Sequence, residues 1–246
     1  MPSEASKRLD GKVALITGAS RGLGRAIAQA YAREGAKVFI CARNQAEVKR
    51  VVSESRRAGQ QIAGSAGDIG KLEDARRIVQ AASGKFGGIN VLVNNASLLG
   101  PRVPIASYPP EAWEEVLGVN LTGLFFVTQL VLQIMIPRRQ GSIINLSSGV
   151  GRVGRARWGA YAAAKFGVEG FTQMVAEEVK EFGIRANAVN PGPTRTQMRA
   201  AAYPDEDPLT LPTPDEVTGI FTYLASDQSA GVTGKSLNGR DWARSN

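Results

Sequence analysis

The sequence predicts an α/β fold, in which one doubly wound parallel β-sheet carries helices on both faces and forms three layers in a single domain spanning residues 1–246. A chain of 246 residues is long enough for one large core. Short β-rich runs alternate with amphipathic helical stretches, without a Ser/Gly-rich linker or an internal repeat. This alternation implies right-handed βαβ units. Because ligands bind beyond the carboxyl ends of such strands, strand-end residues are the first candidates for function.

The expected elements follow one another regularly along the chain. Helical patterns lie between the strands, and the longest are expected at residues 110–136 and 158–182. Strands are predicted where short runs are rich in β-branched and other apolar residues. These runs cover residues 12–17, 37–41, 61–66, 90–94, 142–146 and 185–189, with a further short strand near Ser236.

Composition narrows the possible chemistry. The chain contains no histidine, which removes the serine-histidine triad, histidine zinc sites and histidine acid-base catalysis. Its single cysteine, Cys41, rules out an internal disulfide and cysteine-based metal clusters, which fits a reducing compartment. We therefore expect no metal site. Proton chemistry must use tyrosine, lysine, carboxylates or a cofactor.

Charge and hydropathy bear on partners and location. A net charge of +8 would suit nucleic acid or a membrane surface, but the basic residues are scattered and form no block. We expect instead a soluble surface with sites for anionic ligands, and neither a nucleic acid nor a membrane partner. The first twelve residues lack an apolar signal core, and the longest apolar run, 124–136, is too short to span a bilayer. A cytoplasmic location is expected.

A glycine-rich turn follows the first expected strand directly and opens the first helical pattern. Glycines allow a tight backbone turn and let a pyrophosphate approach the free N–H groups of a helix N-terminus. The spacing, Gly-x-x-x-Gly-x-Gly, departs from the usual dinucleotide fingerprint, and a purely structural turn is the alternative. Its place between strand and helix favours a Rossmann-type dinucleotide site. The predicted cofactor-binding residues of this turn are Gly18, Ser20, Arg21, Gly22, Leu23 and Gly24.

The end of the second strand indicates which dinucleotide would bind. Proteins selective for NAD tend to place an acidic residue there to hold the ribose hydroxyls. Here Ala42 takes that position and Arg43 follows it. Arg43 and Arg21 are expected to clamp a 2′-phosphate, which predicts NADP(H). The alternative is that both arginines are merely exposed loop residues.

Polar residues also mark the ends of the third and fourth strands. Asp68 and Ile69 are placed to meet an adenine, although an Asp before a helix is as often an N-cap. Asn95 lies among small residues that would let a flat ring approach. Asn120 stands inside a helical pattern, an unfavourable place for an asparagine without a task.

Tyr161 and Lys165 form the most informative pair. Three alanines between them favour helix, so the two side chains stand on one face, about one turn apart. An ammonium ~4 Å from a phenol, at an effective dielectric of ~20, favours the phenolate by roughly 4 kcal/mol, or about three pKa units. Such a tyrosine would exchange protons near pH 7. The alternative is an ordinary half-buried aromatic beside a solvated lysine. Ser148 ends the fifth strand, thirteen positions before Tyr161.

Taken in this order, these motifs resemble the classical short-chain dehydrogenase/reductase family from about Leu9 to Gly239. The resemblance implies an NADP(H)-dependent oxidoreductase that transfers a hydride between the nicotinamide and a carbonyl or secondary alcohol. By position, Tyr161 would exchange the proton and Ser148 would polarise the substrate oxygen. Lys165 would hold the nicotinamide ribose and lower the tyrosine pKa, and Asn120 would position a water.

The same resemblance extends to the C-terminal third of the chain. It implies that Pro191, Gly192, Thr194 and Thr196 lie beside the nicotinamide, and that residues 196–214 form a substrate lid that is mobile until a ligand binds. It also implies a homo-oligomer, either a tetramer or a dimer. Two segments depart from the family pattern. Ser97 replaces a glycine near the nicotinamide, and the chain reads Leu-Asn-Gly-Arg-Asp at 237–241 where Val-Asp-Gly-Gly is common.

The substrate remains open at this stage. The small-molecule candidates are 3-oxoacyl thioesters, as in the reductases that this chain resembles, and sugars or polyols. A non-catalytic NADP-binding sensor or scaffold is the alternative outside enzymes, although such a protein would have no use for a tuned phenol. Three arginines, Arg152, Arg155 and Arg157, could attract an anionic substrate, point to solvent or pair across an interface.

Overall fold

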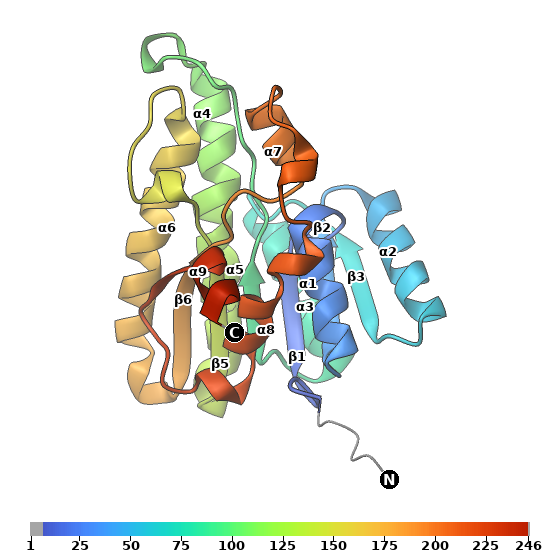
Figure 1. Cartoon of the computed structure of the whole chain (residues 1–246). Coiled ribbons are helices and arrows are strands. Elements are labelled where there is room, and N and C mark those ends of the chain that lie inside the picture. Colours follow the sequence, from blue (N-terminus) through green and yellow to red (C-terminus); the bar gives the residue numbers. More distant parts are fainter. Residues whose placement is uncertain (1–6, 246) are drawn as a thin grey trace.

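A seven-stranded parallel sheet with the order β3-β2-β1-β4-β5-β6-β7 forms the middle layer of the protein. The computed structural model describes residues 7–245 (Figure 1). Every strand expected from the sequence is present, with bounds within two residues of those predicted. The strands are β1 (Val13–Thr17), β2 (Lys37–Ala42), β3 (Ile62–Ala66), β4 (Val91–Asn94), β5 (Gly141–Leu146), β6 (Ile184–Asn190) and β7 (Ser236–Asn238).

Helices cover both faces of the sheet, as Figure 1 shows, and each face has its own apolar core. On one face, α1 (Gly22–Arg33), α2 (Gln45–Arg57) and α8 (Gly219–Ala225) contribute buried side chains. On the other face, α3 (Leu72–Phe86), α5 (Leu124–Met135) and α6 (Gly159–Glu178) do so. The remaining helices are α4 (Pro110–Leu117), α7 (Gln197–Ala202) and α9 (Gly239–Ser245).

The central strands are buried along their whole length, which explains their almost continuous apolar sequences. All residues of β1, β4 and β5 are buried. A parallel strand covered by helices on both faces has no solvent side, so apolar residues do not alternate with polar ones. The order of the sheet reverses between β1 and β4, and the carboxyl ends of these two strands therefore border the crevice in which this architecture binds ligands.

The long helix predicted at 110–136 is continuous but not uniform. It begins as α4, winds as a π-helix over Gly118–Gly123, and continues as α5. A π-turn inserts an extra residue into the α-helical repeat and occurs often at functional sites. Asn120, the unfavourable helical asparagine, lies within this turn.

In the described part of the chain, one helix, Pro110–Arg138, is long and apolar enough by composition to cross a membrane. It has 29 residues and a mean hydropathy of 1.8, so the apolar helix is longer than the run expected from the sequence. Its α5 half packs Val127, Val131 and Met135 into the core against the sheet. Core helices of large soluble domains have a similar composition, because much of their surface is buried against neighbouring elements.

Candidate active site

The glycine turn between β1 and α1 has the conformation that its glycines make possible. Gly18 and Gly22 have φ values of +65° and +53°, in the region that favours glycine. α1 begins at Gly22, and no side chain caps its first N–H groups. Free N–H groups at a helix N-terminus favour an anion. The turn therefore fits the pyrophosphate of a dinucleotide.

Asn95 braces this turn from the end of β4. Its amide nitrogen donates to the carbonyl oxygens of Thr17 (2.8 Å) and Gly18 (2.9 Å). The Thr17 hydroxyl in turn accepts hydrogen bonds from the backbone N–H groups of Asn95 and Ala96, both at 3.0 Å. The Asn95 side chain thus supports the shape of the cofactor turn. From the sequence we expected Asn95 to lie near a flat ring, and these hydrogen bonds to the turn were not predicted.

Gly24 is the position of the turn that tolerates a side chain least. A Cβ atom there would lie 2.3 Å from the Asn95 amide nitrogen and 2.6 Å from the Gly18 carbonyl oxygen. We expect Gly24→Ala to lower the free energy of unfolding by about 1–3 kcal/mol, as overpacking does, and to weaken dinucleotide binding. A Cβ atom at the exposed helical residue Gly84 would meet no neighbouring group within 4 Å, so Gly84→Ala is expected to stabilise by about 0.5–1 kcal/mol. Urea denaturation of both variants tests the pair; equal effects would contradict it.

The residues expected around the adenosine half lie together at the carboxyl ends of β2 and β3. Arg43 is 55% exposed and makes only a 3.5 Å contact with Glu115, so its guanidinium is available to a ligand. Arg21 is exposed at the N-cap of α1. The Ser20 hydroxyl donates to Glu47 (2.6 Å) and is therefore engaged within the protein.

Asp68 and Ile69 follow β3 as expected, but Asp68 is not the N-cap of α3. The N-cap is Lys71, and the Asp68 carboxylate instead accepts a hydrogen bond from the Gly70 N–H (3.0 Å). Ile69 is buried, and its backbone lies against Gly123, where a Cβ atom would come within 2.9 Å of the Ile69 carbonyl group. This close packing fixes the loop after β3 against the π-turn.

Three predicted catalytic side chains, Ser148, Tyr161 and Lys165, are brought together at the end of β5 and the start of α6. Tyr161 and Lys165 are buried, with 8% and 3% of their surfaces exposed. The Lys165 ammonium lies 5.6 Å from the centre of the Tyr161 ring. The side chain of Ser148 lies close enough to Tyr161 to favour its ionised form. The fourth, Asn120, lies in the π-turn, which contacts α6.

The expected lowering of the Tyr161 pKa is wrong. Burial raises the pKa of Tyr161 to about 12, and the nearby Ser148 side chain offsets only part of this effect. Burial also lowers the pKa of Lys165 to about 8, against the attraction of Glu169. The Lys165 amine donates to the carbonyl oxygen of Leu146 (2.7 Å). Desolvation of both groups therefore outweighs the attraction that the simple two-charge argument assumed.

Asn120 has a definite structural task. Its side-chain oxygen accepts a hydrogen bond from the Leu98 N–H (2.7 Å), and its side-chain nitrogen donates to the Leu98 carbonyl oxygen (2.8 Å). This reciprocal pair ties the π-turn to the segment after β4. The side-chain oxygen and nitrogen each keep capacity for one more hydrogen bond, so this pairing leaves the predicted contact with a water untested.

The segment after β6 lies against the glycine turn. The Asn190 side chain accepts a hydrogen bond from the Gly192 N–H (3.1 Å), and the Thr194 hydroxyl donates to the Gly192 carbonyl oxygen (3.2 Å). Thr196 caps α7 by accepting from the Arg199 N–H (3.2 Å). The Thr196 methyl group would be 3.6 Å from a Cβ atom at Gly22. The two segments that the sequence assigns to the cofactor are thus neighbours.

A partly buried ion pair between Arg152 and Glu169 was not expected. Arg152 pairs with Glu169 (3.0 Å) and donates to the Asn238 side chain (2.6 Å). The Glu169 carboxylate also accepts hydrogen bonds from the hydroxyls of Ser147 and Ser236. The network joins β5, α6 and β7. Arg152 is thereby a structural residue and not a substrate anchor, whereas Arg155 and Arg157 are exposed. The only sequence signal was Glu169, one helical turn after Lys165.

An aromatic rim borders Tyr161. The Trp158 ring lies 5.5 Å from the ring of Tyr161 and 6.1 Å from that of Tyr203. Tyr203 follows α7, within the predicted lid segment 196–214, and α7 stands above the sheet in Figure 1. Met198 and Ala202 of the same segment pack into this cluster. The lid segment therefore contacts the catalytic region directly.

Ser97, one of the two departures from the family pattern, follows β4 at the carboxyl edge of the sheet. Its hydroxyl is buried, and it has no hydrogen-bond partner within the described residues. Together with the uncapped N-terminus of α1, an unsatisfied hydroxyl beside the glycine turn fits a polar ligand, such as a dinucleotide, at this place.

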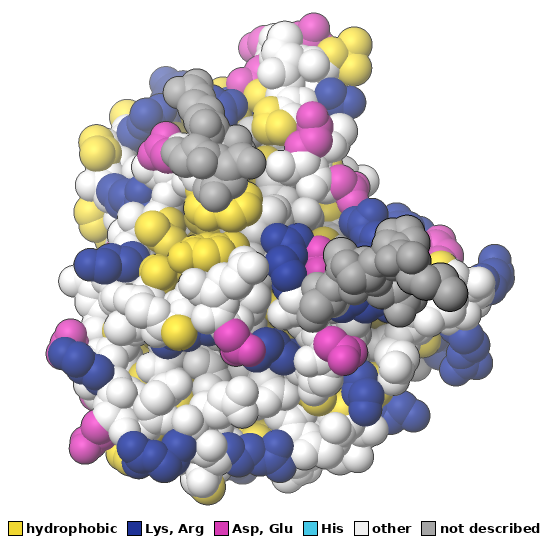
Figure 2. All heavy atoms as spheres, turned by 60° about the horizontal axis from the view of Figure 1, so that its bottom comes forward, with side chains coloured by type: hydrophobic (Ala, Val, Ile, Leu, Met, Phe, Trp, Pro, Cys, Tyr) yellow, Lys and Arg dark blue, Asp and Glu magenta, His cyan; other side chains and the backbone are white. Residues whose placement is uncertain are grey.

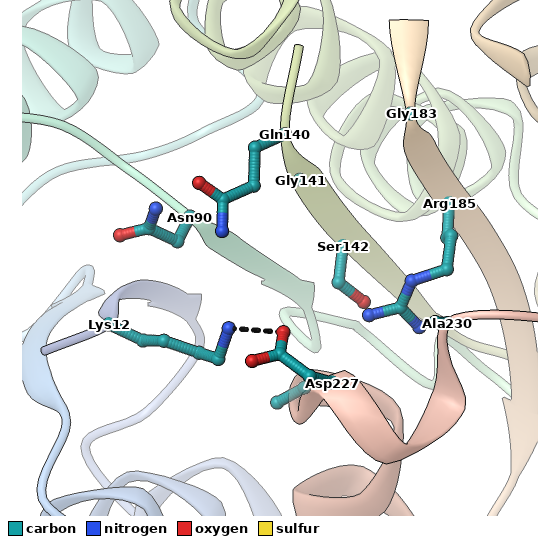
Figure 3. Close-up of a pocket in the computed structure, with 10 residues that line it drawn as sticks. Lys12, Asn90, Gln140, Gly141, Ser142, Gly183, Arg185, Asp227 and Ala230 are labelled. Atoms are coloured by element: carbon teal, nitrogen blue, oxygen red, sulfur yellow. Dashed lines mark hydrogen bonds and ion pairs between the residues drawn. The ribbon is translucent and has the colours of Figure 1, made fainter. Parts of the chain in front are cut away.

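A separate hollow of about 150 Å³ lies at the opposite, amino-terminal edge of the sheet. In Figure 3, Lys12 and Asp227 are joined across it, at 2.7 Å. Arg185 donates to the carbonyl oxygens of Leu224, Ser226 and Ser229. The two cations that line the hollow, Lys12 and Arg185, are thus already engaged within the protein. This hollow is therefore a poor candidate for an active site. Figure 2 shows the molecule turned so that the bottom of Figure 1 comes forward. Basic side chains are scattered over this surface, with acidic ones between them.

Comparison with known proteins places the chain in a family. The family described as short chain dehydrogenase matches residues 12–207. This chain belongs to that family. The chain is 37% identical over 233 residues to the uncharacterized oxidoreductase YciK of Escherichia coli K12, and the match covers 94% of this chain and 92% of the relative. It is also 37% identical over 238 residues to the 3-oxoacyl-[acyl-carrier-protein] reductase FabG of Vibrio cholerae, covering 94% and 96%.

Two solved structures are similarly close to this short chain dehydrogenase. One, from Shigella flexneri 2a and complexed with NADP, has a TM-score of 0.91 at 36% identity, covering 96% of this chain and 99% of that one. The other, from Escherichia coli CFT073 and complexed with NADPH, has a TM-score of 0.91 at 37% identity, covering 96% of this chain and 99% of that one. The predicted fold and family are therefore confirmed. The protein is an oxidoreductase of a family that uses a nicotinamide cofactor.

Proposed function

We propose that this short chain dehydrogenase transfers a hydride between NADP(H) and a carbonyl or secondary alcohol, with Asn120, Ser148, Tyr161 and Lys165 as its active-site residues. The observation that carries the proposal is the convergence of Ser148, Tyr161 and Lys165 at the carboxyl end of β5, on the same edge of the sheet as the glycine turn. Polar groups that are buried together without a ligand cost stability. A functional role accounts for their presence here.

In this mechanism, the bound nicotinamide supplies or accepts the hydride. The Tyr161 hydroxyl donates a proton to the carbonyl oxygen during reduction and takes one from the alcohol during oxidation. The Ser148 hydroxyl, which lies close to Tyr161, donates to the same substrate oxygen and stabilises the negative charge that develops on it. Both donors are fixed before the substrate arrives, so little reorganisation is needed.

Lys165 has two roles in the proposal. It binds the nicotinamide ribose, and its ammonium attracts the phenolate form of Tyr161. In the protein alone, the amine is held by Leu146, and its pKa of about 8 leaves part of it uncharged at the upper end of the physiological pH range. Anionic phosphates of the bound cofactor would favour the charged amine and so strengthen its attraction for the phenolate.

NADP(H) is the proposed cofactor because two arginines, Arg21 and Arg43, are available where the 2′-phosphate would lie. The glycine turn, Asp68 and Ile69, and the segment with Pro191, Gly192, Thr194 and Thr196 are proposed to bind the rest of the molecule. The NADP and NADPH complexes of relatives at 36% and 37% identity support this choice.

Replacement of Arg43 tests the cofactor preference. We expect Arg43→Ala to raise the Kd for NADPH about 10- to 100-fold and to leave the Kd for NADH within about twofold, because a charge-assisted bond to phosphate is worth about 1.5–3 kcal/mol. The matched control is Arg50→Ala, which removes an exposed arginine of α2 that pairs with Glu54. Fluorescence titration measures both constants. An equal loss of NADH and NADPH binding would contradict the 2′-phosphate role.

Two substrate classes are supported to different degrees. Relatives described as 3-oxoacyl-[acyl-carrier-protein] reductases, at 37% identity, favour reduction of 3-oxoacyl thioesters. Sugar or polyol oxidation, and a non-catalytic NADP-binding role, are the alternatives. An NADPH-oxidation panel of acetoacetyl thioesters, diketones, quinones and keto sugars separates them. Turnover of one class identifies the substrate type, and binding of NADPH without any turnover would favour a sensor.

We further propose that residues 196–214 form the lid and that the protein is a cytoplasmic homo-oligomer, a tetramer or dimer. Large apolar side chains on α5 and α6 support the assembly: Phe125, Phe166 and Met174 are 40%, 45% and 48% exposed. Phe125 also contacts Phe171 of α6 edge-on at 6.4 Å, so the apolar side chains of the two helices adjoin. Light scattering coupled to size-exclusion chromatography measures the assembly; a monomer at micromolar concentration would exclude it.

A further inference from the structure

Arg102 lies between the aromatic residues that border the active site. It belongs to the segment that joins β4 to α4, and its guanidinium lies 4.5 Å from the centre of the Trp158 ring and 4.9 Å from that of Tyr203. It also donates a hydrogen bond to the carbonyl oxygen of Ala202, in α7. In Figure 1, α4 and α7 both rise above the sheet, and Val116 of α4 belongs to the same apolar cluster as Ala202 of α7. Arg102 thus contacts both the segment before α6, which contains Trp158, and the segment of α7, which contains Ala202 and is followed by Tyr203. These two segments border the proposed catalytic tyrosine.

The charge of Arg102 is not neutralised as those of the neighbouring arginines are. Arg199 binds Glu206 through two contacts, of 2.5 and 2.6 Å. Arg152 pairs with Glu169. Within residues 7–245, no carboxylate lies within ion-pair distance of Arg102, and its Nε atom is buried without a hydrogen-bond partner. A half-buried cation among apolar side chains is unfavourable without an opposite charge. Contacts with two aromatic faces and one carbonyl group compensate for this only in part.

The position of Arg102 relative to the reacting atoms limits what could supply that opposite charge. Trp158 contacts both Arg102, whose guanidinium lies 4.5 Å from its ring centre, and Tyr161, whose ring centre lies 5.5 Å away. The guanidinium and the phenol that is proposed to protonate the substrate therefore adjoin the same aromatic ring. An anionic group on the substrate could reach Arg102 while its carbonyl group reaches Tyr161, provided that only a few bonds separate the two.

We propose that Arg102 binds the carboxylate or phosphate of an anionic substrate whose carbonyl group reacts at Tyr161. This inference rests on the proposed oxidoreductase function and specifies its substrate class, a short oxo acid or oxo phosphoester. Nη1 is bound to Ala202 and Nε is buried, so within residues 7–245 Nη2 is the nitrogen that can donate a charge-assisted hydrogen bond to either anion. Binding of the anion would also hold α7 closed through the bond from Arg102 to Ala202.

The test uses matched pairs of charged and neutral substrates with the NADPH-loaded full chain. Straight-chain 3-oxo and 4-oxo carboxylates are compared with their methyl esters, and dihydroxyacetone phosphate with dihydroxyacetone. We expect the wild type to have a higher kcat/KM for the charged member of a pair. Arg102→Met should lower that kcat/KM about 30- to 100-fold and change the neutral member less than about threefold. Preference for carboxylate or for phosphate identifies the anion.

Two further variants test whether the loss of any nearby positive charge would give the same result. Arg155→Met removes an equally charged but exposed arginine from the loop before Trp158, and it should change both members of a pair less than about twofold. Arg102→Lys keeps the charge and should retain part of the preference. If the wild type favours the neutral members, or if Arg102→Met lowers both members equally, the proposal is wrong. The comparison within the wild type decides the question even where Arg102→Met does not fold.

The experiment also separates this inference from the proposed function. Should the wild type bind NADPH but reduce none of these compounds, binding of the same oxo carboxylates to the NADP-loaded protein is measured by calorimetry. Carboxylate binding that exceeds ester binding, and that Arg102→Met abolishes, supports the anion site whether or not turnover occurs. Absence of any such preference overturns the anion site and leaves the oxidoreductase assignment to the thioester and diketone panel.

Discussion

Tyr161→Phe is expected to lower kcat by roughly a thousandfold or more while leaving NADPH binding nearly unchanged, since a positioned proton donor contributes about 10²–10⁴ to the rate. The variant removes one oxygen atom. It keeps the buried ring and its contact with Trp158, so the fold should be preserved. Stopped-flow or steady-state NADPH oxidation gives kcat, and fluorescence titration gives the Kd.

The control for this experiment is Tyr223→Phe, which removes a phenol oxygen from α8, outside the proposed site. It should retain wild-type kcat. Retention of most of the wild-type rate by Tyr161→Phe would mean that another group donates the proton. A large rise in the Kd for NADPH would instead mean that the hydroxyl serves mainly to bind the cofactor.

Lys165→Met is expected to abolish turnover and, at pH 7, to make the protein more stable. Burial lowers the pKa of Lys165 from 10.5 to about 8. The folded chain therefore binds fewer protons than the unfolded chain between pH 8 and 10.5, and the charged lysine destabilises the fold below pH 8. The penalty is roughly 3 kcal/mol, and loss of the hydrogen bond to Leu146 offsets about 1 kcal/mol of the gain, leaving a net gain of roughly 2 kcal/mol.

The sign of this effect can be checked by its dependence on pH. Because the penalty disappears as the lysine loses its proton in both states, the stability gain of Lys165→Met should shrink as the pH rises from 8 to 10.5. Urea denaturation of variant and wild type at several pH values measures the difference. Lys49→Met, at an exposed position of α2, should show no such trend. A gain independent of pH, or a variant that is less stable at pH 7, would contradict the account.

Local signals were sufficient to predict the fold. The central strands are short, nearly continuous apolar runs because both faces of the sheet are covered, and such runs are recognisable without any tertiary information. The glycine turn could be located for a similar reason. Its two positive φ values require glycine at Gly18 and Gly22, so the conformation leaves a direct mark on the sequence.

The proximity of three proposed site residues was predictable from the sequence, but their electrostatics were not. Position along strand ends and helix turns brought Ser148, Tyr161 and Lys165 together, as expected. Their pKa values depend on how completely they are buried, which no local pattern reveals. A two-charge estimate therefore gave the wrong direction for Tyr161, whose pKa is raised to about 12.

Pairings between distant residues were the other feature that the sequence did not reveal. Arg152 and Glu169 are 17 positions apart, and Arg199 and Glu206 are 7 apart, but nothing in the sequence distinguishes these arginines from Arg155. The role of Arg102 was likewise invisible, because it depends on Trp158 and Tyr203, which come from two other segments of the chain. Such contacts arise only once the fold is formed.

The π-turn at Gly118–Gly123 affects how the whole helix 110–138 should be interpreted. One inserted residue rotates everything that follows by roughly 100° relative to a regular α-helix. A helical wheel drawn straight through the segment would therefore assign the wrong side to one half of it. Deleting a single residue inside the turn would restore regular α-helical winding. It would also rotate either Asn120 or the apolar face of α5 away from the groups that it contacts.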